Sequence, residues 1–245
     1  MKLRLTVLSL RYSSWSIRPW LALRAAGASF EVETVELPGL GVQGADSGPA
    51  LAKISVDELS HRRSLGSVTG LFPVLTVDDT PVHESLAICE WVAEAFPDAG
   101  LWPIDSLDRA RARSACCEMV SGFQNLRTRM SCHVFARVPG FQPEEATRAD
   151  IHRVFEIWHD ALSASGGPYL FGHFGIADCM YFPVLTRFRT YSIELDSEIE
   201  SYANRLEKHA AVQAWAKEAS KAPAIPAYDD SVRRLGGDPE AARPH

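Results

Sequence analysis

Apolar and polar residues alternate with a period of two in two stretches of the first hundred residues. Residues 2–10 and 30–37 place every second side chain on an apolar face, as half-buried strands do, and residues 72–77 form a short β-branched run that also predicts a strand. Thr80–His83 is expected to pair back on the third strand after a turn at Asp78–Asp79. The pattern therefore predicts four short strands in this part of the chain.

Helical spacing follows the first, second and fourth of these strands. Ser16–Gly27 and Glu84–Phe96 repeat apolar residues three and four positions apart, and Leu51–Leu65 predicts a weaker, mostly surface helix. A stretch rich in Gly, Pro and Ser, Pro38–Pro49, is expected to form a loop. Because strand–helix–strand units join parallel strands and a tight hairpin joins antiparallel ones, we expect a sheet with both kinds of pairing.

The strand pattern ends at Pro97. Residues 97–105 predict a linker, and the chain beyond it shows helical periodicity with no convincing strand. The expected helices are 107–137, 144–164, 176–191, 198–208 and 212–221. We therefore expect an α/β domain over residues 1–97, an all-helical domain over residues 105–221, and a Pro- and Gly-rich tail over residues 222–245 that is loose at its end.

The composition is that of a globular protein with a mildly acidic charge. Its 25 Lys and Arg against 31 Asp and Glu give a net charge of −6, which argues against a general nucleic-acid-binding role. No apolar stretch approaches the ~20 residues of a membrane span, and Arg4 and Arg11 argue against a signal peptide. Five unpatterned cysteines lack zinc spacing and fit a reducing compartment. We expect a cytoplasmic protein with no metal and no membrane partner.

Four short segments occur in an order and spacing that resemble the glutathione S-transferase family. The segments are 13–18 (SSWSIR), 70–75 (GLFPVL), 84–88 (ESLAI) and 174–178 (FGIAD). The first resembles the serine motif of zeta-type and related bacterial members, the second the family's cis-proline segment, and the last two the starts of two helices. The resemblance, which runs from about Leu3 to Lys221, implies a thioredoxin-like N-terminal domain, an all-helical C-terminal domain, glutathione as co-substrate and a homodimer.

The resemblance identifies Ser13 as the catalytic residue. The thiol of glutathione has a pKa of about 8.5 and is mostly protonated at neutral pH. A hydroxyl that donates to the sulfur and the amides of a helix N-terminus both favour the thiolate, and Ser13 stands between the first strand and the first helix. Taken from local sequence alone, Ser13, Ser14 and Ser16 simply cap the helix. Ser14 is the alternative donor, and is otherwise expected to contact glutathione.

Other residues are expected to hold the rest of glutathione. By resemblance, a cis bond at Phe72–Pro73 presents the Phe72 backbone to the cysteinyl residue, whereas the sequence alone also fits an edge strand that begins with Pro73. Glu84 and Ser85 open a helix whose N-terminus suits the γ-glutamyl group, with ordinary capping as the alternative. In the fourth segment, Asp178 is expected to reach back to the start of its helix.

Met119, Phe123 and Arg127 recur at helical spacing in the first long helix of the second domain. The resemblance makes them candidates to line a pocket for a small hydrophobic electrophile, while core packing is the ordinary explanation of such a stripe. Leu71 departs from the family pattern, because a cation or glutamine commonly stands there and holds the glycyl end of glutathione. Arg62–Arg63 is a candidate replacement, with a solvated helix face as the alternative.

Three functions stay open. The first is a serine-type glutathione transferase, a cytoplasmic homodimer that conjugates glutathione to small electrophiles. The second is a glutathione-dependent isomerase like the zeta-type maleylacetoacetate isomerases, which the Ser13–Ser14 pair supports, although Trp15 stands where those enzymes typically have cysteine. The third is a non-catalytic binding or scaffold protein on the same fold, supported by Leu71 and the long segment 38–70.

Overall fold

The computed structural model describes residues 1–35 and 56–243 of the chain. Its strands are β1 (Leu3–Val7), β2 (Glu31–Thr34), β3 (Val74–Val77) and β4 (Thr80–His83). They form one sheet in the order β2-β1-β3-β4, in which β1 pairs parallel with β2 and antiparallel with β3, and β3 pairs antiparallel with β4. The four strands and both kinds of pairing are confirmed, whereas the loop predicted over residues 38–49 lies outside the described residues.

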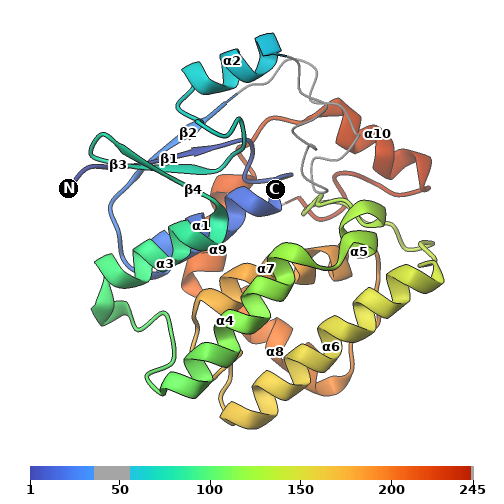
Figure 1. The fold of residues 1–245 in the computed structure, drawn as a ribbon. Coiled ribbons are helices and arrows are strands. Elements are labelled where there is room, and N and C mark those ends of the chain that lie inside the picture. The colour runs from blue at the N-terminus through green and yellow to red at the C-terminus, as the bar shows by residue number, and fades with distance from the viewer. Residues whose placement is uncertain (36–55, 244–245) are drawn as a thin grey trace.

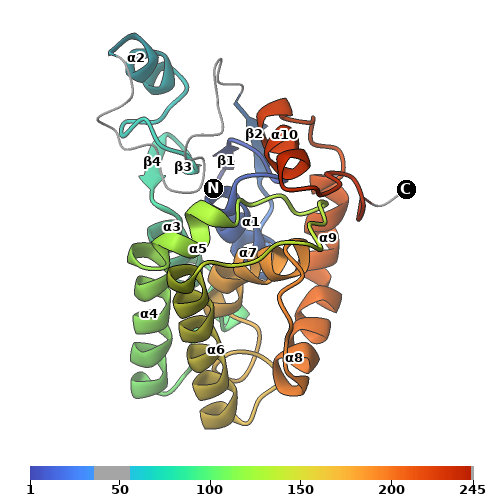
Figure 2. The same ribbon diagram turned by 90° about the vertical axis from the view of Figure 1, so that its right-hand side faces the viewer.

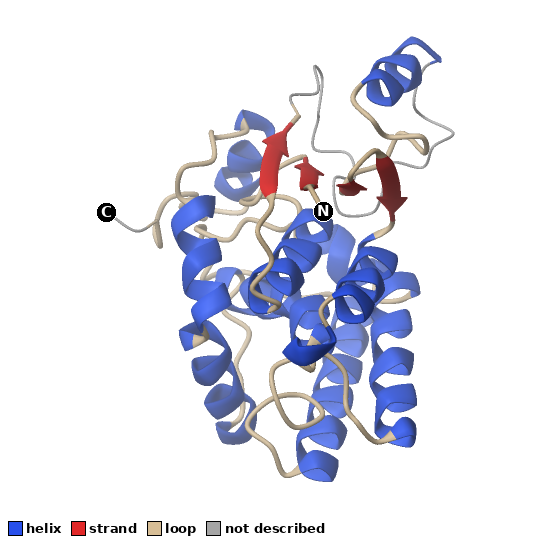
Figure 3. Ribbon diagram, turned by 90° about the vertical axis from the view of Figure 1, so that its left-hand side faces the viewer, coloured by secondary structure: helices blue, strands red, loops and turns tan. Residues whose placement is uncertain are grey.

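Helices α1 (Ser14–Ala25) and α3 (Ser85–Ala95) lie between the sheet and the helical part of the molecule (Figure 1). Figure 3 shows the strands at one end of the molecule and most of the helices at the other. The apolar faces of sheet and helices meet in a core in which Leu5, Ile17 and Ile88 have no exposed surface. This core holds the ends of the strands and the starts of the two helices in fixed positions.

Helix α2 (Val56–Ser64) is mostly exposed, as its weak apolar pattern predicts, but it carries a buried arginine. The Arg62 guanidinium donates to the Gly70 carbonyl oxygen (3.1 Å) and pairs with Glu58 on the same helix. These contacts hold the segment that leads to β3. Arg62 is therefore neither solvated nor available to a ligand, whereas the neighbouring Arg63 is exposed.

The helical part is built around α7. Its helices are α4 (Ser106–Ser121), α5 (Gln124–Arg129), α6 (Glu145–Ser165), α7 (Ile176–Thr190), α8 (Ser197–Lys208), α9 (Ala210–Ala219) and α10 (Pro226–Arg234), preceded by a short 3-10 helix at Pro97–Ala99. Almost every residue of α7 is buried, as its continuous apolar pattern predicts, and α4 and α6 lie side by side next to it (Figures 1 and 2). Across the described residues, no helix is both long enough and apolar enough to cross a membrane.

The prediction of one helix over residues 107–137 is wrong. A turn separates α4 from α5, with Phe123 in a left-handed conformation (φ 57°), and residues 130–137 are not helical. The turn packs Phe123 and Leu126 into the core, and the Asp150 carboxylate on α6 accepts a hydrogen bond from the Leu126 amide (2.9 Å). Contacts with distant residues thus outweigh the local helical pattern.

The tail expected over residues 222–245 folds onto the rest of the molecule. Helix α10 begins at Pro226, where the missing N–H of proline costs no helical hydrogen bond, and it buries Tyr228. Beyond α10, Asp238 pairs through its backbone with Arg137 in the chain that follows α5. The described part of the tail is therefore folded, and the last two residues of the chain lie outside the described structure.

Asp178 reaches back to the start of α7, as predicted. Its carboxylate accepts hydrogen bonds from the amides of Gly175 (2.9 Å) and Leu170 (3.1 Å) and from the Tyr202 hydroxyl (3.0 Å). Burial raises the pKa of Asp178 to about 7, and the hydrogen bonds oppose this shift. One fully buried side chain thus joins the turn before α7 to α7 and α8.

His159 on α6 contacts two carboxylates at the start of α8. Its ring nitrogens lie 2.7 Å from a Glu198 oxygen and 2.9 Å from an Asp196 oxygen. Burial lowers the pKa of His159, but the hydrogen bonds to Glu198 and Asp196 outweigh burial, so the pKa is raised above its ordinary value of about 6.5. The contact between α6 and α8 is therefore strengthened by protonation.

The stabilising effect of His159 is expected to depend on pH. Because its pKa is raised in the folded chain, its contribution to stability is fully present below about pH 6.5 and is lost as the pH rises through the raised pKa. We expect His159→Gln to lower the Tm more at pH 6 than at pH 9. His61→Gln, at an exposed position of α2, is the matched control in thermal unfolding. A loss of Tm that is the same at both pH values would contradict the prediction.

Candidate functional site

Ser13 is the residue before α1 and caps the helix. Its side-chain oxygen accepts hydrogen bonds from the Ser16 amide (3.3 Å) and from the Ser16 hydroxyl (3.0 Å). The Ser16 hydroxyl in turn accepts a hydrogen bond from the amide of Leu8, the residue after β1 (3.3 Å). Ser13, Ser14 and Ser16 are all buried. The capping role that local sequence predicts for Ser13 is therefore present.

The Ser13 hydroxyl keeps its own proton available. A serine oxygen accepts two hydrogen bonds and donates one, and the two Ser16 donors occupy both acceptor positions. Among the described residues, no acceptor takes the Ser13 proton. Capping and donation are thus compatible, and Ser16, which the sequence indicates only as a cap, arranges the hydroxyl as a donor. The signal in the sequence is a second serine three positions after the cap.

The N-terminus of α3 lies against that of α1. The Ser85 hydroxyl donates to the Trp15 carbonyl oxygen (2.9 Å), which joins the first turns of the two helices. Glu84, the residue before α3, is exposed and has a left-handed backbone (φ 67°). The unpaired amides at a helix N-terminus favour an anion, and here two N-termini lie side by side.

The Phe72–Pro73 bond is cis, as the resemblance implies. It directly precedes β3, where Val74 pairs with Thr6 of β1 on one side and with His83 of β4 on the other. Because Thr6 leads into the loop before α1 and His83 is followed by Glu84, the cis bond lies between the two helix N-termini. Phe72 precedes the first residue of β3, so its backbone stands outside the strand.

Leu71, the departure from the family pattern, is held by hydroxyl groups. Its carbonyl oxygen accepts a hydrogen bond from the Ser67 hydroxyl (2.5 Å), and its amide donates to the Thr69 hydroxyl (3.2 Å). Arg62, a candidate replacement for the missing cation, is engaged by Gly70 and Glu58. Arg62 therefore does not compensate for Leu71.

Trp15 is flanked by two arginines. The guanidinium carbon of Arg18 lies 4.2 Å from the centroid of the Trp15 indole, and that of Arg127 lies 5.3 Å from it. Arg18 is fully buried and donates to the Met180 carbonyl oxygen (3.0 Å). Arg127 comes from α5, so the helical part of the molecule reaches the first turn of α1. Both guanidinium groups add positive charge at this helix N-terminus.

Met119 and Phe123 do not share a helical face with Arg127. Met119 lies in α4, Phe123 lies in the turn after it, and their side chains are 0% and 6% exposed. Met119 contacts Arg127 through its backbone: its carbonyl oxygen lies 3.5 Å from a guanidinium nitrogen of Arg127. The structure thus brings Arg127 to the Trp15 ring in the first turn of α1 and packs Met119 and Phe123 into the core. Within residues 1–35 and 56–243, no three His, Cys, Asp or Glu side chains are grouped to hold a metal ion.

The chain matches two protein-family models. Residues 12–95 match the N-terminal domain of glutathione S-transferases and residues 134–218 match the C-terminal domain, so that together the models cover more than half of the chain. The chain is 30% identical over 139 residues to a probable maleylacetoacetate isomerase 2 of Drosophila melanogaster and 31% identical over 113 residues to a probable maleylacetoacetate isomerase of Caenorhabditis elegans. These matches cover 53% and 46% of this chain and 60% and 44% of the two relatives.

Solved structures share the fold. A glutathione transferase homolog from Burkholderia GL BGR1, with bound glutathione, has a TM-score of 0.63 and 21% identity, over 89% of this chain and 98% of that one. A diazinon-metabolizing glutathione S-transferase of the silkworm Bombyx mori has a TM-score of 0.63 and 19% identity, over 89% and 98%. At these identities the likeness shows the fold, a thioredoxin-like domain followed by a helical one. On its two family matches and this fold, the chain belongs to the glutathione S-transferase family.

Proposed function

We propose that this protein binds glutathione and transfers its sulfur to small hydrophobic electrophiles. The observation that carries the proposal is the Ser13 hydroxyl, whose acceptor positions are filled by Ser16 and whose proton is left for a third partner. The hydroxyl stands at the N-terminus of α1, next to that of α3. Membership of the family and the glutathione bound to the Burkholderia homolog support glutathione as that partner.

Two effects lower the pKa of a thiol placed beside Ser13. A hydrogen bond to a charged group contributes about 1.5–3 kcal/mol, or one to two pKa units, and helix amides add about 0.3–2 kcal/mol. From an ordinary pKa of about 8.5, the thiol reaches roughly 6–7 and is largely ionised at neutral pH. The thiolate then forms a carbon–sulfur bond with the electrophile, and the leaving group departs with the electron pair of the bond that breaks.

The rest of glutathione is assigned to the groups around Ser13. The Phe72 backbone beside the cis Phe72–Pro73 bond pairs with the main chain of the cysteinyl residue. The backbone amides at the N-terminus of α3, that of Ser85 among them, take the γ-glutamyl carboxylate, and Glu84 takes its ammonium group. Ser14, buried in the first turn of α1, is the alternative donor to the sulfur.

The electrophile is proposed to bind next to Trp15. This side chain is half-buried and follows the serines directly, so an electrophile that contacts the indole lies close to the sulfur. Arg127 approaches the same ring from α5 and adds a positive charge for a polarised or anionic group on the electrophile. Met119 and Phe123 lie in the core and are proposed to support the Trp15 and Arg127 side chains that contact the electrophile.

Isomerisation is the second candidate. Both curated relatives are named probable maleylacetoacetate isomerases, and the Ser13–Ser14 pair fits such an enzyme. An isomerase adds the thiolate to a double bond and releases it unchanged, so a cis-enone diacid is converted without loss of glutathione. A transferase instead consumes one glutathione for each electrophile. The third candidate is a non-catalytic scaffold, which Leu71 supports. For each of the three candidate functions, we propose that the protein is a cytoplasmic homodimer.

Millimolar glutathione is expected to raise the Tm of the protein at neutral pH. A ligand at 100 times its Kd that binds only the folded chain stabilises it by about 2.7 kcal/mol. Thermal unfolding with an equal concentration of dithiothreitol is the control, because that compound supplies thiols without the glutamyl and cysteinyl groups. An unchanged Tm would contradict a glutathione site and favour the scaffold.

A further inference from the structure

We propose that Asp229, on α10 near the C-terminus, is a positioning residue that holds the Ser13 hydroxyl in place through Tyr12. The inference rests on the proposed function and adds to it a residue outside both matched family domains, which span residues 12–95 and 134–218. Asp229 does not contact the proposed thiol. It acts on the segment of chain that carries Ser13.

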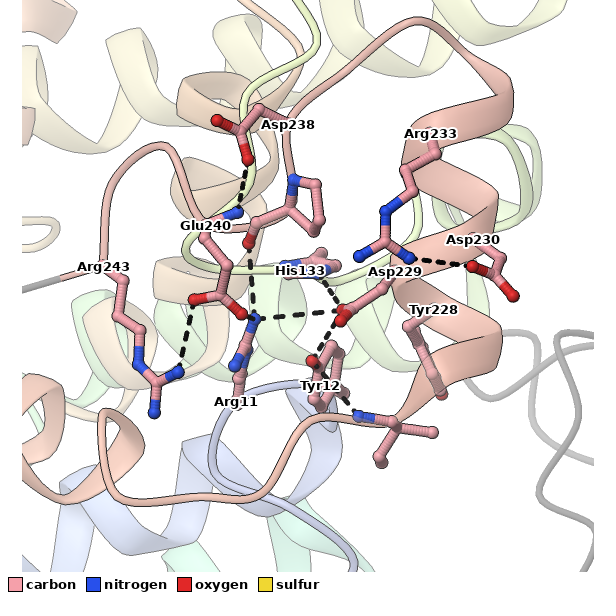
Figure 4. A network of polar contacts seen from close by, with 12 residues as sticks. Arg11, Tyr12, His133, Tyr228, Asp229, Asp230, Arg233, Asp238, Glu240 and Arg243 are labelled. Atoms are coloured by element: carbon pink, nitrogen blue, oxygen red, sulfur yellow. Dashed lines mark hydrogen bonds and ion pairs between the residues drawn. The ribbon is translucent and has the colours of Figure 1, made fainter.

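Asp229 accepts hydrogen bonds from two buried side chains (Figure 4). One Asp229 oxygen lies 2.8 Å from the Tyr12 hydroxyl and 2.7 Å from the His133 Nε2 atom, and the Arg11 guanidinium lies 3.8 Å from the same oxygen. The Tyr12 hydroxyl also accepts a hydrogen bond from the Ile225 amide (3.3 Å), just before α10. Tyr12, which directly precedes Ser13, is thus tied to α10 at its hydroxyl.

The residues before Tyr12 are tied to the same end of the chain. The fully buried Arg11 pairs with the Glu240 carboxylate (2.5 Å) and donates to the Pro239 carbonyl oxygen (3.3 Å). The Leu10 carbonyl oxygen accepts a hydrogen bond from the Trp215 indole on α9 (3.0 Å). Three consecutive residues before Ser13 are therefore anchored by segments that come more than 200 residues later.

Asp229 supplies a negative charge that compensates the buried positive charge of Arg11. A buried guanidinium is costly unless anions compensate it, and Arg11 has Asp229 (7% exposed side chain) and the half-exposed Glu240. Burial lowers the pKa of His133, so its ring stays neutral and adds no compensating charge. Without the Asp229 charge, Arg11 has no buried anionic partner among the described residues of the cluster, and we expect the Arg11–Tyr12 segment to shift.

A shift of this segment moves Ser13 relative to the sulfur. Hydrogen bonds depend steeply on distance and angle, and a displacement of about 1 Å from a reacting group costs rate even when the mutated residue is remote. The binding groups at Phe72, Glu84 and Ser85 lie just before β3 and at the start of α3, and among the described residues no hydrogen bond or ion pair joins them to α10. Loss of Asp229 should therefore impair ionisation of the thiol more than binding of glutathione.

The test compares Asp229→Asn with Asp230→Asn in the full-length protein. Asp230 is the next residue on α10, and it is exposed and paired with Arg233 (2.8 Å), so the control removes the same charge from the same helix. The pKa of bound glutathione is read from the ultraviolet absorbance of the thiolate between pH 5 and 10, and kcat and KM are measured at pH 7. Asp229→Asn is expected to raise the thiol pKa by at least one unit and to lower kcat at least tenfold, with KM for glutathione changed less than twofold.

Asp230→Asn is expected to leave all three quantities as in the wild type. If Asp229→Asn lowers the Tm but leaves the thiol pKa unchanged, Asp229 is merely structural and the inference is overturned, while the proposed function stands. If Asp229→Asn does not fold, Tyr12→Phe, which removes only the donating hydroxyl, decides in the same way: a raised thiol pKa supports positioning and an unchanged one overturns it. A wild-type protein without a thiolate signal would overturn the proposed function and this inference together.

Discussion

Replacing Ser13 with alanine is expected to lower kcat at pH 7 at least tenfold with a small electrophile. The change removes the hydrogen bond that the hydroxyl is arranged to donate, because both of its acceptor positions are filled by Ser16. Losing a hydrogen bond to a charged sulfur raises the thiol pKa by about one to two units. The loss of kcat should shrink toward pH 9, where the thiol ionises without help.

The measurement is kcat from pH 6 to pH 9 with glutathione and an activated aryl chloride. Ser121→Ala is the matched control, because this exposed serine at the end of α4 donates only to the Cys117 carbonyl oxygen (3.0 Å). It is expected to leave kcat unchanged across the range. Unchanged turnover in Ser13→Ala would remove Ser13 from the mechanism and make Ser14 the donor to test.

Replacing Asp178 with alanine is expected to lower the free energy of unfolding by about 3–5 kcal/mol. The change leaves the amides of Gly175 and Leu170 and the Tyr202 hydroxyl without their acceptor. Asp178 has no exposed surface, so water cannot replace the carboxylate at these donors. Each buried donor left without a partner costs about 1–3 kcal/mol, and cavity relaxation recovers part of the sum.

Urea unfolding of Asp178→Ala and Asp105→Ala separates burial from capping. Asp105 caps α4 by accepting hydrogen bonds from the amides of Leu107 (2.8 Å) and Asp108 (2.9 Å), but it is exposed. Water takes over these donors in the variant, so a clearly smaller loss of stability is expected there. Losses of equal size would show that burial of the Asp178 network adds nothing to its capping role.

Features that depend on neighbouring residues could be predicted from the sequence. The strand at 3–7 follows a period-two pattern and the strand at 74–77 a β-branched run, and both signals are set within a few residues. The cap at Asp178 and the cis bond at Phe72–Pro73 follow from short motifs. The same motifs predicted which residues to consider for glutathione, Ser13 first among them.

Features that depend on distant contacts could not be predicted in this way. The helical pattern continues through Phe123, but burial of that ring and the Asp150 carboxylate bonded to α5 favour a turn there. The start of helix α10 is indicated by its proline, but the sequence of α10 does not predict which residues it packs against.

Local sequence accounts for the strands, for most of the helices and for the chemical groups at their ends, because periodicity and capping act within one or two turns of chain. Which of these groups meet depends on how the whole chain folds. Ser85 donates to the Trp15 carbonyl oxygen, and Tyr12 donates to Asp229, a residue 217 positions later. Such pairs have no local signal, because the free energy that selects them comes from burying charge and apolar surface together once the chain has closed around its core.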